Sequence, residues 1–137
     1  MKKQIGIWID STKAIIVALT GEQESIVKIE SGIENRIYHD NEGDKGSFIG
    51  SRHINNEKKF EERRKQQIAH FLDRVIDRIN HADEVCIFGP AEMKTKLSGR
   101  MDAVGKSIRY KLKSVATADT MTMNQVVAKV KEYYKSS

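Results

Sequence analysis

Three carboxylates are the residues of this 137-residue chain whose type suits hydrolytic chemistry. Two-metal hydrolysis needs several carboxylates that converge on two ions about 3.5–4 Å apart. Asp10 follows an apolar alternating segment, and Glu84 and Asp119 are its candidate companions. None of the three lies in a distinctive motif, and Asp10-Ser11-Thr12 is also typical of a tight turn. The residues leave open both a nuclease or other hydrolase that uses Mg²⁺ or Mn²⁺ and a turn without catalysis.

A second kind of chemistry, the binding of polyanions, is indicated by the distribution of charge. The chain has a formal net charge of +5, and the segment 92–113 alone holds seven Lys or Arg residues against two acidic ones. Residues 108–113 alternate strictly between apolar and basic types, which predicts a strand with its cations on one face. Such a row suits nucleic-acid phosphates, whereas the alternative is a strand whose lysines protect an exposed sheet edge. The candidate phosphate contacts are Lys94, Lys96, Arg109, Lys111 and Lys113.

The polar segment 34–56 is longer than an ordinary connection, so we expect a functional or a flexible loop. It is rich in glycine and serine and carries Lys45, Phe48 and Arg52. We expect these three side chains to insert into or clamp a nucleic acid, and the alternative is a plain connection.

Other kinds of site find no support in the sequence. It contains no glycine-rich phosphate loop, nucleophile elbow or zinc-protease motif. The single cysteine excludes an internal disulfide and fits a reducing, cytoplasmic setting. No apolar run approaches the ~18 residues of a membrane span, so we expect no membrane partner. We also expect no cofactor apart from the metal of the hydrolase alternative.

The candidate residues are positioned by a predicted α/β fold that fills one domain over 1–137. Three consecutive strands with short turns predict an antiparallel meander, and a later strand–helix–strand unit predicts a parallel crossover. Helices would then pack on a single mixed sheet. The predicted strands are 5–10, 14–20, 25–33, 85–88 and 108–113, and the predicted helices are 57–80, 90–101 and a last one capped by 117–120.

The order of several short motifs resembles the central domain of archaeal and eukaryotic class-one release factors and of Pelota. The resemblance runs from Phe60 to about Ser98, with a basic cluster on a long helix, a strand, a Gly-Pro turn and a helix that carries Lys-Thr-x-Leu. The chain most resembles short stand-alone bacterial proteins of this superfamily, labelled translational machinery proteins. The shared motifs are Trp-Ile-Asp at 8–10, Lys-Gly…Gly-Ser-Arg at 45–52 and Gly-Pro-Ala-x-x-Lys-Thr at 89–95.

This resemblance implies a ribonuclease H-like, ribosomal-protein-like fold and a role on or near ribosomal RNA or tRNA. Release factors of this kind carry Gly-Gly-Gln in the loop before the long helix, and this sequence has no such triplet. We therefore expect ribosome or RNA association without peptidyl-tRNA hydrolysis. A metal-dependent nuclease centred on Asp10 and a homo-oligomeric interaction module are the alternatives.

Overall fold

Strands and helices follow each other along the chain in the order that the sequence predicts. The computed structural model describes residues 2–34, 50–103 and 111–136, and within the middle range it describes side chains from 57 onward. The elements are β1 (Lys3–Ile9), β2 (Lys13–Thr20), β3 (Gln23–Glu30), α1 (Gly50–Ile79), β4 (Glu84–Gly89), α2 (Met93–Ala103), β5 (Lys111–Thr117) and α3 (Met123–Ser136).

The strands form one mixed sheet in the order β3-β2-β1-β4-β5. β1, β2 and β3 pair antiparallel, whereas β4 is parallel to both β1 and β5. The predicted meander and the predicted parallel β4–α2–β5 unit are therefore confirmed. The fold belongs to the α/β class and is compatible with a ribonuclease H-like or ribosomal-protein-like architecture.

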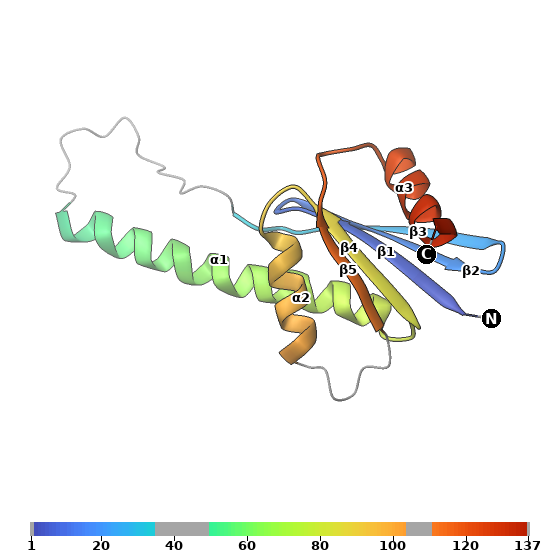
Figure 1. Ribbon diagram of the computed structural model, residues 1–137. Helices are drawn as coiled ribbons and strands as arrows, with labels where there is room; N and C mark the ends of the chain where they lie inside the picture. The colour runs from blue at the N-terminus through green and yellow to red at the C-terminus, as the bar shows by residue number, and fades with distance from the viewer. Residues whose placement is uncertain (1, 35–49, 104–110, 137) are drawn as a thin grey trace.

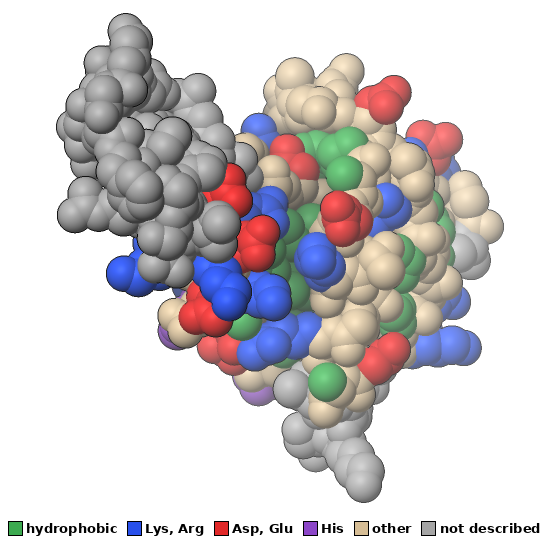
Figure 2. Space-filling model, turned by 90° about the vertical axis from the view of Figure 1, so that its left-hand side faces the viewer, with side chains coloured by type: hydrophobic (Ala, Val, Ile, Leu, Met, Phe, Trp, Pro, Cys, Tyr) green, Lys and Arg blue, Asp and Glu red, His purple; other side chains and the backbone are tan. Residues whose placement is uncertain are grey.

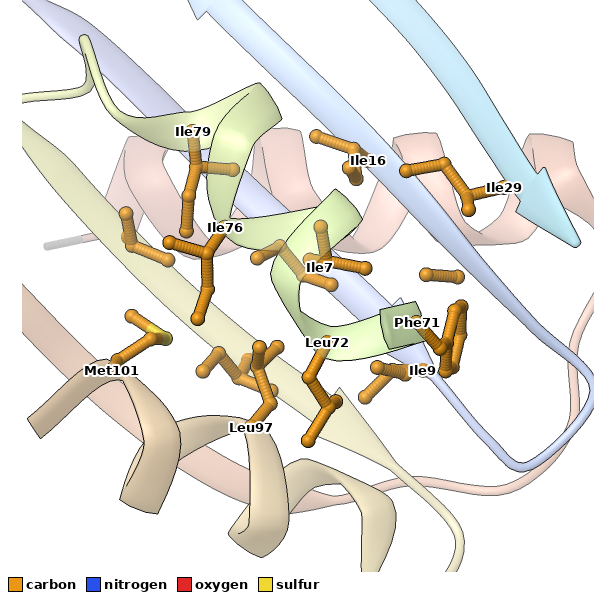
Figure 3. Packing of buried hydrophobic residues seen from close by; sticks show 14 of the residues in the cluster. Ile7, Ile9, Ile16, Ile29, Phe71, Leu72, Ile76, Ile79, Leu97 and Met101 are labelled. Carbon is orange, nitrogen blue, oxygen red and sulfur yellow. The ribbon is translucent and has the colours of Figure 1, made fainter. Parts of the chain in front are cut away.

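Helices cover the two faces of the sheet unequally. Of the described helices, α1 and α2 lie on one face and α3 lies on the other (Figure 1). Alternation along β1 directs Ile5, Ile7 and Ile9 into the core beneath α1 and α2, whereas Trp8 joins the core beneath α3. Figure 3 shows the helical side of the first core, formed by Phe71, Leu72, Ile76 and Ile79 of α1 and by Leu97 and Met101 of α2.

The helix α1 begins earlier than the sequence predicts. The prediction placed its start at Glu57 and assigned 34–56 to a loop, but the helix already begins at Gly50. The first half of α1 extends beyond the sheet (Figure 1). That part needs no apolar stripe, so the periodicity that reveals an amphipathic helix is missing from its sequence. Residues 35–49 of the predicted loop lie outside the described residues.

Close packing holds α3 against the centre of the sheet. A Cβ atom on Gly6 of β1 would lie 2.3 Å from Cγ2 of Val130, so the absence of a side chain at Gly6 allows this approach. One turn later in α3, the buried Tyr134 hydroxyl donates a hydrogen bond of 2.7 Å to the carbonyl oxygen of Ile5. Both contacts fix α3 against β1.

Three boundaries of helices and strands in the C-terminal half of the chain also differ from the prediction. β5 runs to Thr117 because its pairing continues along β4 as far as Gly89, whereas the alternating pattern ends at Lys113. α2 begins at Met93, three residues after Pro90. The predicted N-terminal cap of the last helix at 117–120 is wrong, since Thr122 and Gln125 cap the N-terminus of α3. Each of these two residues accepts with its side chain a hydrogen bond from the other's backbone N–H (2.8 and 3.2 Å).

Candidate nucleic-acid interface

The structure describes the side chains of some predicted phosphate contacts and not those of others. Lys45, Phe48 and Arg109 lie outside the described residues, and Arg52 lies in the first turn of α1, where only the backbone is described. The role predicted for these four residues stays a prediction. The described candidates are Lys94 and Lys96 on α2 and Lys111 and Lys113 on β5.

The two α2 lysines make contacts at the beginning of their own helix. The Lys94 ammonium donates to the carbonyl oxygen of Ala91. Lys96 Nζ lies 3.9 Å from Glu92 Oε2, and both side chains of this pair are largely exposed. An exposed pair at this distance holds its lysine weakly, so Lys96 remains accessible to an anion.

The two β5 lysines point to the face of the sheet that carries α3. Leu112 between them packs against the core beneath α1 and α2. Lys111 is exposed and lies in register with Glu84, and Lys113 occupies an irregularity of the β4–β5 ladder with Nζ 3.5 Å from Glu84 Oε2. The structure thus divides the predicted set, because Lys94 and Lys96 belong to a helix on the opposite face.

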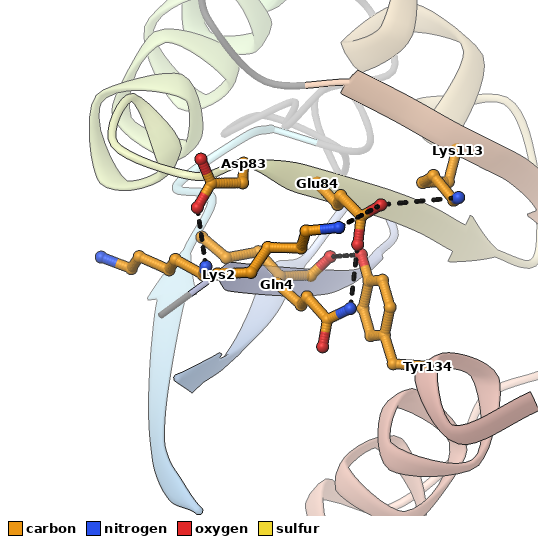
Figure 4. Close-up of polar contacts among 8 residues, drawn as sticks. Lys2, Gln4, Asp83, Glu84, Lys113 and Tyr134 are labelled. Carbon is orange, nitrogen blue, oxygen red and sulfur yellow. Dashed lines mark hydrogen bonds and ion pairs between the residues drawn. The ribbon is translucent and has the colours of Figure 1, made fainter. Parts of the chain in front are cut away.

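Glu84 is the centre of a polar cluster where β1, β4 and β5 meet (Figure 4). Its carboxylate accepts a hydrogen bond of 2.8 Å from Gln4 Nε2 and lies 3.7 Å from Lys2 Nζ and 3.5 Å from Lys113 Nζ. The hydrogen bond from Gln4, followed by the charges of Lys2 and Lys113, lowers the pKa of Glu84. This carboxylate therefore has a clear structural role, and two lysines share its single negative charge.

The carboxylates proposed for two-metal hydrolysis do not converge. Asp10 Oδ1 accepts hydrogen bonds from Thr12 N and Oγ1 at 2.8 Å and from Lys13 N at 2.9 Å, which closes the β1–β2 turn. Glu84 lies beside Gln4, six residues before Asp10 along β1, or roughly 20 Å away. Asp119 follows β5, and its carbonyl oxygen accepts a hydrogen bond from the Trp8 indole.

The described ranges contain no group of three or more His, Cys, Asp or Glu side chains that could hold a metal ion. The set of Asp10, Glu84 and Asp119 predicted for the nuclease alternative is therefore not assembled. The residues share a type that suits metal binding, but Glu84 begins β4, whereas Asp10 and Asp119 follow the carboxyl ends of β1 and β5 at the opposite end of these strands.

Arginines of α1 and α2 bind acceptor groups within the chain. Arg63 Nε lies 3.1 Å from Glu34 Oε2, and Arg74 Nη2 donates to the carbonyl oxygen of Glu30. Arg100 of α2 makes two hydrogen bonds, of 2.6 and 2.9 Å, to the Asp73 carboxylate and holds the pKa of that carboxyl below its usual range. Figure 2, viewed from the side toward which α1 extends, shows acidic and basic side chains interspersed. The described part of this side carries no uniform positive surface.

The sequence analysis missed a groove beside α3. α3 lies mainly over β1 and β2, and a hollow of about 520 Å³ lies between this helix and the β4–β5 side of the sheet. Cys86 and Phe88 line it from β4, and Lys129 and Tyr133 line it from α3. Burial raises the pKa of the Cys86 thiol to about 11, so this floor is neutral. The spacing of Lys129, Tyr133 and Ser136 along one helical face is the signal that could have revealed the wall.

Comparisons with known proteins give a distant structural likeness. No protein-family model matches the sequence, and no curated protein matches it. Among solved structures, the crystal structure of an archaeal translation termination factor is similar, with 12% sequence identity and a TM-score of 0.47. The match covers 97% of this chain but 40% of that factor. Within the described ranges, no helix combines the length and the apolar composition that a membrane crossing requires.

Proposed function

We propose that this protein associates with the ribosome or with RNA in translation and does not hydrolyse peptidyl-tRNA. The motif order from Phe60 to Ser98 supports this proposal, since the motifs lie on a long helix, a strand, a turn and a second helix in succession. The sequence contains no Gly-Gly-Gln triplet, which the resemblance would require for hydrolysis. The inferred partners are ribosomal RNA or tRNA, the inferred location is the cytoplasm, and no metal or other cofactor is invoked.

The observation that carries the proposal is the pair of lysines on the open edge strand β5. Lys111 is exposed and makes no ion pair with a described residue. Lys113 shares the Glu84 carboxylate with Lys2, so this end of the sheet keeps a positive charge. Cations held on a strand have fixed spacing, which suits the backbone contacts that position a protein on a nucleic acid.

Sedimentation of tagged protein from host lysate tests the proposal directly. We expect the protein to migrate with a ribosomal particle at low salt and to leave it after ribonuclease treatment or at moderate salt. Each phosphate neutralised contributes about 0.7–0.9 to the slope of log affinity against log salt. A protein that stays at the top of the gradient in every condition refutes ribosome association.

A charge-reversal pair locates the contact. Arg109→Glu with Lys111→Glu should abolish co-migration while the far-UV circular dichroism is unchanged. Lys58→Glu with Lys59→Glu makes the same change of charge on exposed residues of α1 and serves as the matched control. Equal losses in both variants would mean that net charge, and not the β5 strand, determines binding.

A homo-oligomer is the second candidate, and the two edge strands favour it. β3 and β5 each have one neighbour in the described sheet, and Ile26 and Val115 on them are each 39% exposed. Edge strands with exposed apolar residues can pair with another copy of the chain. Light scattering across a range of protein concentrations tests this, and a constant monomer mass would exclude it.

A further inference from the structure

The groove beside α3 lies along β4 and β5, the strands on the side of β1 away from β2. Cys86 and Phe88 of β4 lie at its deep side and are only 3% and 4% exposed, so the accessible part of the floor belongs to β5. Ser114 and Ala116 of β5 are in register with them and continue the floor to the edge of the sheet. The volume of about 520 Å³ lies within the range of about 300–1,000 Å³ typical of small-ligand sites.

The wall of the groove is one face of α3. Lys129, Glu132, Tyr133 and Ser136 line it with spacings of three and four residues, as expected for one side of a helix. The Tyr133 ring makes an edge-to-face contact with Tyr134, with ring centroids 5.1 Å apart. Because Tyr134 is itself anchored through its hydroxyl, the position of the Tyr133 ring is well determined before any ligand binds.

Positive charge stands at both ends of the groove. At one end, Lys129 Nζ lies 5.6 Å from the centroid of the Phe88 ring. At the other end, Ser114 adjoins Lys113, which together with Lys2 is matched by the single carboxylate of Glu84 (Figure 4). An anion on either side of a bound ligand would therefore meet a cation that is not fully neutralised.

Polar groups between the two ends suit the edge of a planar ring. The Ser114 hydroxyl can donate or accept a hydrogen bond, whereas the Ser136 hydroxyl donates to the carbonyl oxygen of Glu132 (3.0 Å) and can still accept one. The Glu132 carboxylate can accept a hydrogen bond from a ring N–H or amino group. Proteins that bind single-stranded RNA place unstacked bases against aromatic side chains and contact the flanking phosphates with cations. An apolar floor, an aromatic wall, hydrogen-bonding groups and terminal cations all occur in this groove.

We propose that the groove between α3 and the β4–β5 edge holds one unstacked base of a single-stranded RNA, with Tyr133 against the base and with Lys129 and Lys113 near the two flanking phosphates. This site deepens the proposed RNA association and rests on it. It also places the base on the same face of the sheet as Lys111, so the RNA would continue along the lysines of β5.

Two binding experiments on the full chain test this site. In the first, ¹⁵N-labelled protein is titrated with adenosine monophosphate, and the amide signals of Ser114, Ala116 and Tyr133 should shift, whereas ribose 5-phosphate should leave them unchanged. In the second, a fluorescent ten-nucleotide single-stranded RNA is titrated with protein. Tyr133→Leu removes the aromatic face and should weaken binding about 10-fold, since base stacking on an aromatic side chain contributes about 1–3 kcal/mol.

Three further variants test whether filling the groove or removing its charge weakens binding, with one of them as the matched control. Ala116→Leu adds bulk to the floor from an exposed edge position without changing charge, and it should weaken binding similarly. Lys129→Ala should weaken RNA binding and reduce its salt dependence, whereas Lys135→Ala removes the same charge from a residue of α3 outside the groove and should change affinity little. Equal effects of Lys129→Ala and Lys135→Ala, with Tyr133→Leu at wild-type affinity, would overturn the site.

The two proposals fail in distinguishable ways. RNA binding by the wild-type protein that the groove variants leave intact would refute the groove and leave the RNA association standing. If the wild-type protein bound neither ribosomes nor RNA, but adenosine monophosphate still shifted the amide signals of the groove, the translation role would be refuted. The groove would then remain a nucleotide-binding site. Absence of both signals would refute both proposals.

Discussion

Replacing Gly6 with alanine tests the close contact that holds α3 against the sheet. The new Cβ would lie 2.3 and 2.7 Å from the two methyl carbons of Val130, whereas non-bonded carbons rest about 3.5–4.0 Å apart. Relief needs a shift of α3 of roughly 1 Å or a change of the Val130 rotamer, which valine resists. We expect Gly6→Ala to lower the free energy of unfolding by about 1–3 kcal/mol, the usual cost of overpacking a core.

Urea denaturation provides the measurement. The chain's single tryptophan, Trp8, is fully buried beneath α3, so its fluorescence reports the loss of this packing together with far-UV circular dichroism. Val130→Ala supplies the space that the new methyl needs. The variant carrying both changes should therefore be less destabilised than the sum of the single variants by about 1 kcal/mol or more. Strict additivity, or an unchanged Gly6→Ala protein, would refute this account of α3.

The remaining predictions concern three polar or reactive groups. The pKa of Glu84 is lower in the folded chain than the ordinary value of about 4.3, so this carboxylate stabilises the fold above that pH, and its contribution is lost as the pH falls through the folded value. Glu84→Gln should therefore flatten the decline of the unfolding free energy on acidification, measured by urea titrations from pH 6 to 3; an unchanged slope would contradict this role. Asp10→Ala should destabilise by about 1 kcal/mol, whereas Asp10→Asn should cost less, because all three hydrogen bonds go to Oδ1, which asparagine retains. Thermal denaturation compares the two, and equal losses would argue against a turn-closing role. The Cys86 thiol, with a pKa of about 11, should react with a disulfide reagent at pH 8 only after denaturation; rapid labelling of the native protein would disprove its burial.

Sequence patterns predicted the elements that contribute to the core and missed boundaries that other forces set. The predicted strand 5–10 and the predicted helix 57–80 both contribute buried isoleucines to the core, and they could be predicted because periodic burial leaves a periodic sequence. The early start of α1 at Gly50 leaves no such trace, since that part of the helix extends beyond the sheet. The end of β5 at Thr117 depends on pairing with β4, which is a tertiary contact. The Thr122–Gln125 capping box has a sequence signal, Thr-x-x-Gln, which marks the start of α3 more accurately than the polar residues at 117–120.

Site prediction met a different limit, because residue type says nothing about distance. Asp10 follows the apolar strand β1, and Glu84 begins the apolar strand β4. The parallel pairing of β1 and β4 therefore puts Glu84 beside Gln4 and far from Asp10. Alternation correctly predicted that Leu112 faces the core. It could not show that Lys113 meets Glu84, a contact between segments far apart in the chain. Charge counts therefore overstate the cations that are available to a polyanion.

The groove depends on the same contacts that stabilise α3, so binding and stability should be coupled. Tyr133 lines the groove while its neighbour Tyr134 is fixed to Ile5, and Val130 one turn earlier rests on Gly6. A shift of α3 away from β1 moves the wall of the groove relative to its floor on β4. If the groove binds a base, Gly6→Ala should weaken RNA binding even though residue 6 lies outside it, and Val130→Ala in the same chain should restore part of the affinity. A control core variant on the opposite face, such as Leu97→Ala, should reduce stability without this loss of affinity, because Leu97 packs beneath α2. Equal losses of affinity in both variants would mean that general destabilisation, and not the position of α3, governs binding.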